Sequence, residues 1–143
     1  MVLDAAKFEA AIKDCKKLMA AVEETGIRLT GGLGDGQPKV SKHKIWFNGN
    51  PSHETFAVDQ VYGQRDLHPD EAMKFAFCKT AQKPYDLAVM GCLLTFKRHL
   101  GKDFRVSSDG DATDWKPGFD LVRTVLGYAE TFLFGDDGIE VTA

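Results

Sequence analysis

The sequence predicts one α+β domain, in which a small, mostly antiparallel sheet packs against a long N-terminal helix, a buried central helix and a C-terminal helix. Three observations lead to this prediction. An amphipathic stretch opens the chain, an almost continuous apolar stretch occupies residues 84–100, and short β-prone runs bounded by turn residues lie between them. At 143 residues the chain is close to the commonest domain size, so we expect residues 1–143 to form a single domain.

The composition excludes several classes of protein. A hydrophobic content of 43% and a charged content of 27% are typical of a globular chain. The formal net charge of −3 argues against a nucleic-acid-binding protein, which normally carries a basic surface. The three cysteines form no CxxC pair, so neither a disulfide framework nor a zinc site is expected. No secretory signal or apolar run of ~20 residues is present, and we expect a cytoplasmic protein without membrane association or cofactor.

Residues 3–25 have the pattern of an amphipathic helix. Asp4 can cap its first turn, and Gly26 can end it. Apolar residues recur three or four positions apart and form one stripe: Ala5, Phe8, Ile12, Cys15, Met19 and Val22. The stripe has two interpretations: it covers a sheet, or it pairs with a second copy in a homodimer.

Residues 26–36 interrupt the regular pattern. Residues 27–30 can form a short strand, and the glycine-rich segment Gly31-Gly32-Leu33-Gly34-Asp35-Gly36 follows it. A phosphate-binding glycine loop must lead into the N-terminus of a helix. Residues 37–40 contain Pro38 and do not start a helix, so the pattern favours a surface loop over a phosphate site.

Residues 43–62 read as a β-hairpin. Residues 45–47 and 55–58 are β-prone, and the turn residues Asn48-Gly49-Asn50-Pro51-Ser52 separate them. Alternation places Lys44, Trp46 and Asn48 on one face and Ile45 and Phe47 on the other. Residues 74–80 alternate well enough to predict a third strand, with a helix that begins at residues 70–73 as the alternative.

The apolar stretch at residues 84–100 predicts a helix buried on several sides, ended by Gly101. A strand at residues 103–107 follows. A final helix then begins near Asp114, which would place Pro117 in the first turn, where proline is tolerated. We expect Phe132 to Phe134 to pack and the C-terminal end to fray.

Three groups of residues could carry chemistry. Cys78, followed by Lys79 and Thr80, precedes a helix N-terminus and could act as a nucleophile with His53 as its base and Glu54 or Asp86 orienting the imidazole. His53 and Thr55 share one strand face and could line a ligand site. Asp109, Asp111 and Asp114 could bind Mg²⁺ or Ca²⁺, but their spacing is that of ordinary turn chemistry, so no metal site is expected.

Three segments resemble a group of small hypothetical proteins encoded by tailed bacteriophages and prophages. They are His53-Glu54-Thr55-Phe56, then Phe77-Cys78-Lys79-Thr80-Ala81 with Lys83-Pro84-Tyr85-Asp86, and Val106-Ser107-Ser108-Asp109-Gly110 with Trp115 beyond. The likeness covers roughly residues 43–126. It implies a phage origin and a convergence of the shared polar residues on one ligand site: His53, Thr55, Cys78, Lys79, Thr80, Tyr85, Asp86, Ser108 and Asp109.

The function favoured by these observations is that of a non-enzymatic accessory protein, which binds a host protein or a small anionic ligand. A small hydrolase or transferase is the alternative, using Cys78 with His53 or a metal at Asp109 and Asp111. Nucleic-acid binding through the basic segment at residues 39–44 with Trp46 is a third interpretation, which the net charge disfavours.

Overall fold

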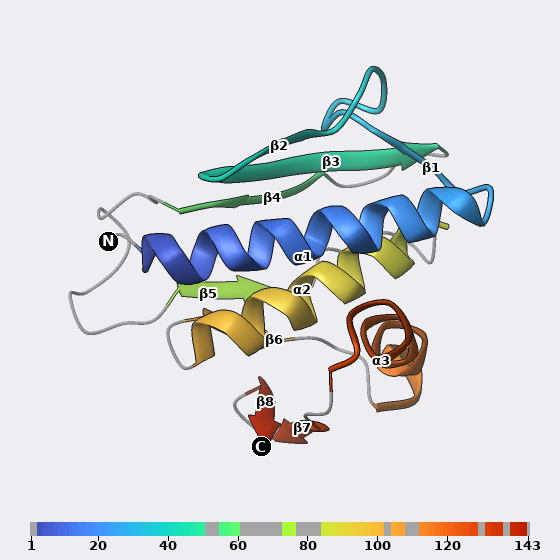
Figure 1. Cartoon of the computed structure of the whole chain (residues 1–143). Helices are drawn as coiled ribbons and strands as arrows, with labels where there is room; N and C mark the ends of the chain where they lie inside the picture. The colour runs from blue at the N-terminus through green and yellow to red at the C-terminus, as the bar shows by residue number, and fades with distance from the viewer. Residues whose placement is uncertain are drawn as a thin grey trace.

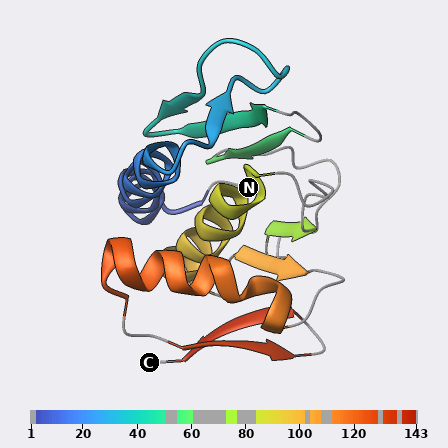
Figure 2. The same ribbon diagram turned by 90° about the vertical axis from the view of Figure 1, so that its right-hand side faces the viewer.

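A computed structural model describes residues 3–50, 55–60, 73–76, 84–101, 104–107, 112–128, 131–135 and 138–142. It has an α+β fold, as the sequence predicts, with mostly antiparallel strands that are divided among separate small sheets. A four-stranded sheet lies on one side of the molecule. Helices α1 and α2 lie beneath it, and α3 and a terminal hairpin lie on the far side of α2 (Figures 1 and 2).

Helix α1 (Ala5–Glu24) confirms the predicted N-terminal helix and both of its ends. The Asp4 carboxylate accepts a hydrogen bond from the Lys7 N–H at 2.9 Å, and Gly26 follows the helix with φ +96°. The predicted stripe is buried except for Ala5, which is exposed in the first turn. The stripe packs against α2 and α3 and reaches β1 and β2, so it lies between the sheet and the other helices.

The sheet is built around β3 (Lys44–Asn50), which pairs antiparallel with three other strands. Strand β1 (Arg28–Thr30) pairs with its C-terminal end, β2 (Lys39–Ser41) pairs with its N-terminal end, and β4 (Phe56–Asp59) pairs with residues 44–47. The hairpin of β3 and β4 was predicted, whereas β2 was not.

The sequence prediction places the turn after β3 too early in the chain, at residues 48–52. Asn48, Gly49 and Asn50 continue strand β3, because the backbone of β1 pairs with all three of them. Turn-forming residues are therefore held in a strand by a partner strand that lies about 20 residues earlier in the chain.

Helix α2 (Asp86–Leu100) is the buried centre of the fold, as predicted, and every residue from Ala88 to Lys97 is buried. Gly101 ends it with φ +58°. The Lys97 ammonium donates hydrogen bonds to the carbonyls of Gly101 at 3.0 Å and Phe104 at 2.8 Å. This buried lysine fastens the end of α2 to the following strand, and its charge suits the helix C-terminus.

Strands β5 (Met73–Ala76) and β6 (Phe104–Ser107) form a parallel pair, and Phe104 and Val106 are both buried, as their alternation predicts. Helix α3 (Ala112–Leu126) begins two residues before the predicted start. Asp114 is therefore inside the helix, and Pro117 is in its second turn, where the ring removes one helical N–H donor.

The C-terminal segment does not fray as predicted. It forms a hairpin of β7 (Thr131–Gly135) and β8 (Gly138–Thr142), whose Phe132 and Ile139 side chains are buried in the core. The Phe132 ring stacks on Phe119 of α3, with ring centroids 5.7 Å apart. Strand pairing and this ring contact therefore hold the C-terminal segment in place.

Candidate functional site

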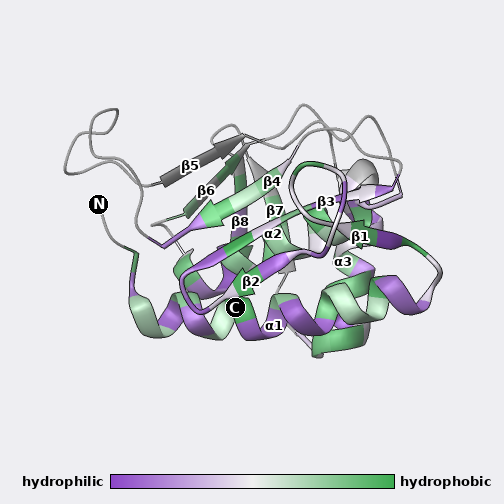
Figure 3. Cartoon of the chain, turned by 90° about the horizontal axis from the view of Figure 1, so that it is seen from above, coloured by the Kyte–Doolittle hydropathy of each residue, from purple (hydrophilic) through white to green (hydrophobic). Residues whose placement is uncertain are grey.

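The outer face of the four-stranded sheet, which points away from the helices, carries polar and charged side chains. Alternation along β3 directs Ile45 and Phe47 into the core, where both are buried, and turns Lys44, Trp46 and Asn48 outward, as predicted. Viewed from above, this face shows hydrophilic segments on β2 and β3 (Figure 3). We call these outward residues and the loop of residues 31–38 that covers part of them the outer face.

Polar side chains of the outer face hold the glycine-rich loop in place. The carbonyl of Gly32 accepts hydrogen bonds from the Asn48 amide at 3.2 Å and from the Thr55 hydroxyl. The Thr30 hydroxyl donates to the neighbouring carbonyl of Gly31 at 3.0 Å. Asn48 and Thr30 are each only 2% exposed, so two buried polar side chains are used to fix this backbone.

Glycine is required at position 32 by the close approach of a tryptophan. A Cβ atom on Gly32 would lie 2.0 Å from Cε2 of the Trp46 indole, far inside a van der Waals contact. The loop closes on itself through hydrogen bonds from the N–H of Gly31 to the Asp35 carbonyl and from the N–H of Gly34 to the Gly31 carbonyl. The sequence predicted a loop here, but its fixed conformation depends on residues of β3 and β4 that the local pattern does not reveal.

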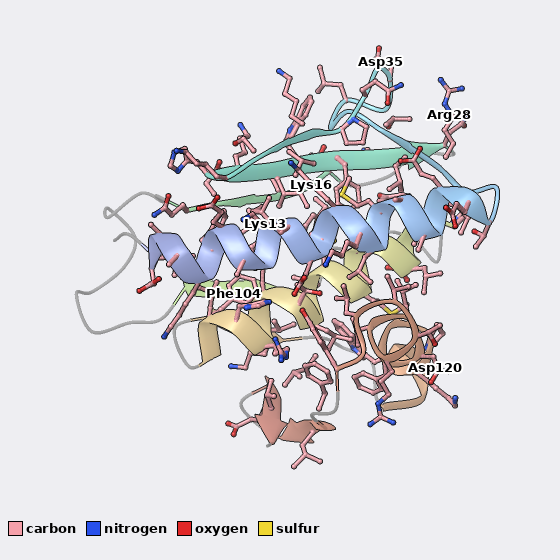
Figure 4. All side chains as sticks on the ribbon, in the orientation of Figure 1. Lys13, Lys16, Arg28, Asp35, Phe104 and Asp120 are labelled. Atoms are coloured by element: carbon pink, nitrogen blue, oxygen red, sulfur yellow. The ribbon has the colours of Figure 1, made fainter. Side chains whose placement is uncertain are left out.

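Exposed cations lie on the strands that flank this loop and, farther along the sheet, on the turn between β2 and β3. Arg28, Lys39, Lys42 and Lys44 are exposed on the outer face and on the turn between β2 and β3. The Lys39 ammonium lies 5.1 Å from the centre of the Trp46 ring, a cation–π distance. The described carboxylates in this region are Asp35, which Figure 4 shows at the top of the loop, and Asp59, which is paired in register with Lys44. The outer face therefore has a basic character in a chain whose formal net charge is −3.

Three of the predicted site residues lie within the described part of the chain. Thr55 belongs to the outer face through its bond to Gly32. Tyr85 and Asp86 begin α2, and the Tyr85 ring is buried against Gly49, where a Cβ atom would lie 2.4 Å from it. Because Gly49 follows Asn48 in β3, Tyr85 packs on the opposite face of the sheet from Thr55. The other predicted residues lie outside the described residues: His53, Cys78, Lys79, Thr80, Ser108 and Asp109, with Glu54 and Asp111.

A second polar cluster, which the sequence did not predict, joins the three helices. The Tyr128 hydroxyl donates to Oδ2 of Asp14 at 2.6 Å, and Nε2 of His99 lies 2.8 Å from the same oxygen. The Arg98 guanidinium lies over the Tyr128 ring at 4.1 Å. Residues 14, 99 and 128 are too far apart in the chain for any local pattern to indicate their contact.

The pKa shifts in this cluster follow from its geometry. Burial raises the pKa of Asp14, but hydrogen bonds from Tyr128 and His99 and the charges of His99 and Lys17 outweigh burial, so the pKa is lowered from 3.8. Burial, together with the hydrogen bond to Asp14 and its negative charge, raises the pKa of Tyr128 above 10.0. The carboxylate and the neutral phenol are thus the stable forms, which suits a structural link between α1, α2 and the end of α3.

The two described cysteines lie in the core. Cys15 of α1 and Cys92 of α2 are both free and fully buried, and the Cys15 thiol is 4.0 Å from the Cys92 carbonyl oxygen. Burial and the proximity of Cys92 raise the pKa of the Cys15 thiol, which disfavours thiolate chemistry at that position.

Searches of protein-family models, curated proteins and solved structures find no match to this chain. Within the described residues, no helix has both the length and the apolar character that a membrane crossing requires. The same residues contain no group of three or more histidine, cysteine, aspartate or glutamate side chains arranged to hold a metal ion.

Proposed function

We propose that this chain is a non-enzymatic binding protein, which holds an acidic segment of a partner protein across the outer face. The observation that carries the proposal is the row of exposed cations on three adjoining parts of the sheet, Arg28 on β1, Lys39 on β2 and Lys44 on β3. Trp46 lies among them; the loop covers part of its indole, and the part that stays exposed can contact a partner side chain.

The spread of the cations favours an extended partner over one small anion. Arg28 is opposite Asn50 at one end of β3, and Lys44 begins the other end. At ~3.4 Å per residue, these positions are about 20 Å apart. A small anion cannot contact both ends, whereas a peptide of six or seven extended residues can.

The glycine-rich loop also does not have the properties of an anion cradle. The N–H groups of Gly31 and Gly34 donate to carbonyl oxygens inside the loop, at 2.9 and 3.0 Å, and are therefore engaged. Residues 39–41, which follow the loop, form a strand and provide no helix N-terminus.

Charge complementarity favours a protein partner over a nucleic acid. The cations share the outer face with Asp35 and Asp59, and the whole chain has a formal net charge of −3. The exposed cations attract a short acidic segment through local contacts. The net negative charge of the whole chain repels a nucleic acid, which carries many phosphates. The resemblance to phage-encoded proteins supports a host protein as the source of the segment.

Charge reversal on the outer face tests this function. The probe is a fluorescein-labelled twelve-residue peptide of alternating Glu and Ser, whose binding is measured by anisotropy at low salt. We expect the triple variant Arg28→Glu, Lys39→Glu, Lys44→Glu to raise the Kd at least about tenfold, because each cation contributes locally to attraction. The affinity of the unchanged protein should fall as salt is added.

The matched control reverses the same number of charges elsewhere. Lys7 of α1 and Lys116 and Arg123 of α3 are exposed, and α3 lies beyond the helical layer from the sheet (Figure 2). The variant Lys7→Glu, Lys116→Glu, Arg123→Glu should change the Kd less than about threefold. Equal losses of affinity in the two triple variants would mean that net charge alone explains the effect, which would contradict the proposal. Tighter binding of a dT oligonucleotide of equal charge would do the same.

A further inference from the structure

The feature that goes furthest beyond this function is Leu33, at the tip of the glycine-rich loop. Its side chain is 84% exposed, the largest exposure among the described large hydrophobic residues. A single exposed leucine is common on protein surfaces, so exposure alone indicates nothing. The difference here lies in how the loop that presents Leu33 is built.

The backbone on both sides of Leu33 is fixed. The two carbonyls before it, those of Gly31 and Gly32, accept hydrogen bonds from the side chains of Thr30, Asn48 and Thr55. After it, the N–H of Gly34 bonds back to the Gly31 carbonyl. The indole of Trp46 lies directly under Gly32. A segment with four glycines would otherwise be among the most flexible in the chain.

A side chain on a backbone held in this way costs less conformational entropy on binding than one on a mobile loop, because the backbone is already ordered, so more of its burial free energy contributes to affinity. The register of the sheet also places it between charges. Lys44 begins β3, and Lys39 of β2 is paired with Trp46 in the N-terminal half of β3. Arg28 of β1 is opposite the C-terminal end of β3, and the loop connects β1 to β2. A partner that reaches both groups of cations must pass the loop.

We propose that Leu33 is an apolar anchor that contacts a hydrophobic side chain of the partner, so that the segment recognised has an apolar residue between acidic residues. This inference rests on the proposed function, since it names the sequence class that the outer face selects. The Asp35 carboxylate near the loop tip strengthens the selection, because it repels an acidic residue placed opposite the loop.

Two peptides and one variant test the anchor. Both peptides carry acidic residues on either side of a central position, which is Ser in the first peptide and Leu in the second. We expect the unchanged protein to bind the Leu peptide about tenfold more tightly, as partial burial of two leucine side chains allows. Leu33→Ser should abolish this preference, so that the variant binds the two peptides with equal Kd. Because position 33 is exposed, this variant should fold normally.

A second variant tests whether the loop conformation matters. Gly32→Ala keeps Leu33 but forces the loop away from Trp46, and it should reduce the preference for the Leu peptide. Equal binding of the two peptides by the unchanged protein would overturn the anchor while the proposed function stands. Binding of neither peptide would instead contradict the proposed function. If Leu33→Ser still prefers the Leu peptide, another residue causes the preference, and the role proposed for Leu33 is wrong.

Discussion

Replacing Phe96 by alanine should lower the free energy of unfolding by about 3–5 kcal/mol, a large part of the 5–15 kcal/mol of a typical domain. Phe96 is fully buried in α2. Its ring lies 5.2 Å from that of Phe8 in α1 and 5.6 Å from that of Phe104 in β6, centroid to centroid. The substitution therefore leaves a cavity between three elements that cannot all move inward together. Urea unfolding followed by circular dichroism measures the loss.

The control for Phe96→Ala is Leu33→Ala, which removes apolar atoms from an exposed position and should change the free energy of unfolding by less than about 0.5 kcal/mol. A loss below about 1 kcal/mol for Phe96→Ala would contradict the central position of α2. Such a result would mean that the three rings do not form one packed core.

Asp14→Asn should lower the free energy of unfolding by about 1–3 kcal/mol at pH 7, because a neutral amide oxygen forms weaker hydrogen bonds with Tyr128 and His99 than the charged carboxylate does. The pH dependence has a defined sign. The pKa of Asp14 is lowered in the fold, so its contribution is present above the unfolded value near 3.8 and is lost as the pH falls below it. The difference between the variant and the unchanged protein should therefore shrink below about pH 4.

At alkaline pH, the free energy of unfolding depends on pH with the opposite sign. The pKa of Tyr128 is raised in the fold, so the stability that its hydroxyl provides is present below pH 10 and declines above it.

The matched control for Asp14→Asn is Asp120→Asn, since Asp120 pairs with Lys116 at 2.8 Å on the exposed surface of α3. It should cost less than about 0.5 kcal/mol at any pH. A difference for Asp14→Asn that stays constant from pH 3 to pH 7 would exclude the assigned role.

The fold was predictable where local periodicity decides the structure. The stripe from Phe8 to Val22 has helical spacing, and the apolar run around Phe96 is longer than a typical strand. Both segments were therefore predicted as helices, and both helices are followed by a glycine as expected. Prediction of secondary structure failed where pairing or packing with a distant segment determines the local conformation. Asn48 to Asn50 have turn chemistry and became strand because β1 pairs with them, and the terminal hairpin is held by Phe119 of α3.

The candidate site could be predicted only in part for the same reason. Alternation placed Lys44, Trp46 and Asn48 on one face, and this arrangement is confirmed. That the same face holds the glycine-rich loop depends on bonds from Asn48 and Thr55 to Gly32, across 16 and 23 positions in sequence. The cluster of Asp14, His99 and Tyr128 spans 114 positions and has no local signature.

The most direct test of the binding face uses the two tryptophans of the chain as reporters. Trp46 is partly exposed among the cations, whereas Trp115 of α3 is 1% exposed. In a ¹⁵N-labelled protein each indole N–H gives one signal, which Trp46→Phe assigns. On titration with the acidic peptide, we expect the Trp46 signal to shift to saturation while the Trp115 signal stays in place. Saturation of binding with an unmoved Trp46 signal would contradict recognition on the outer face.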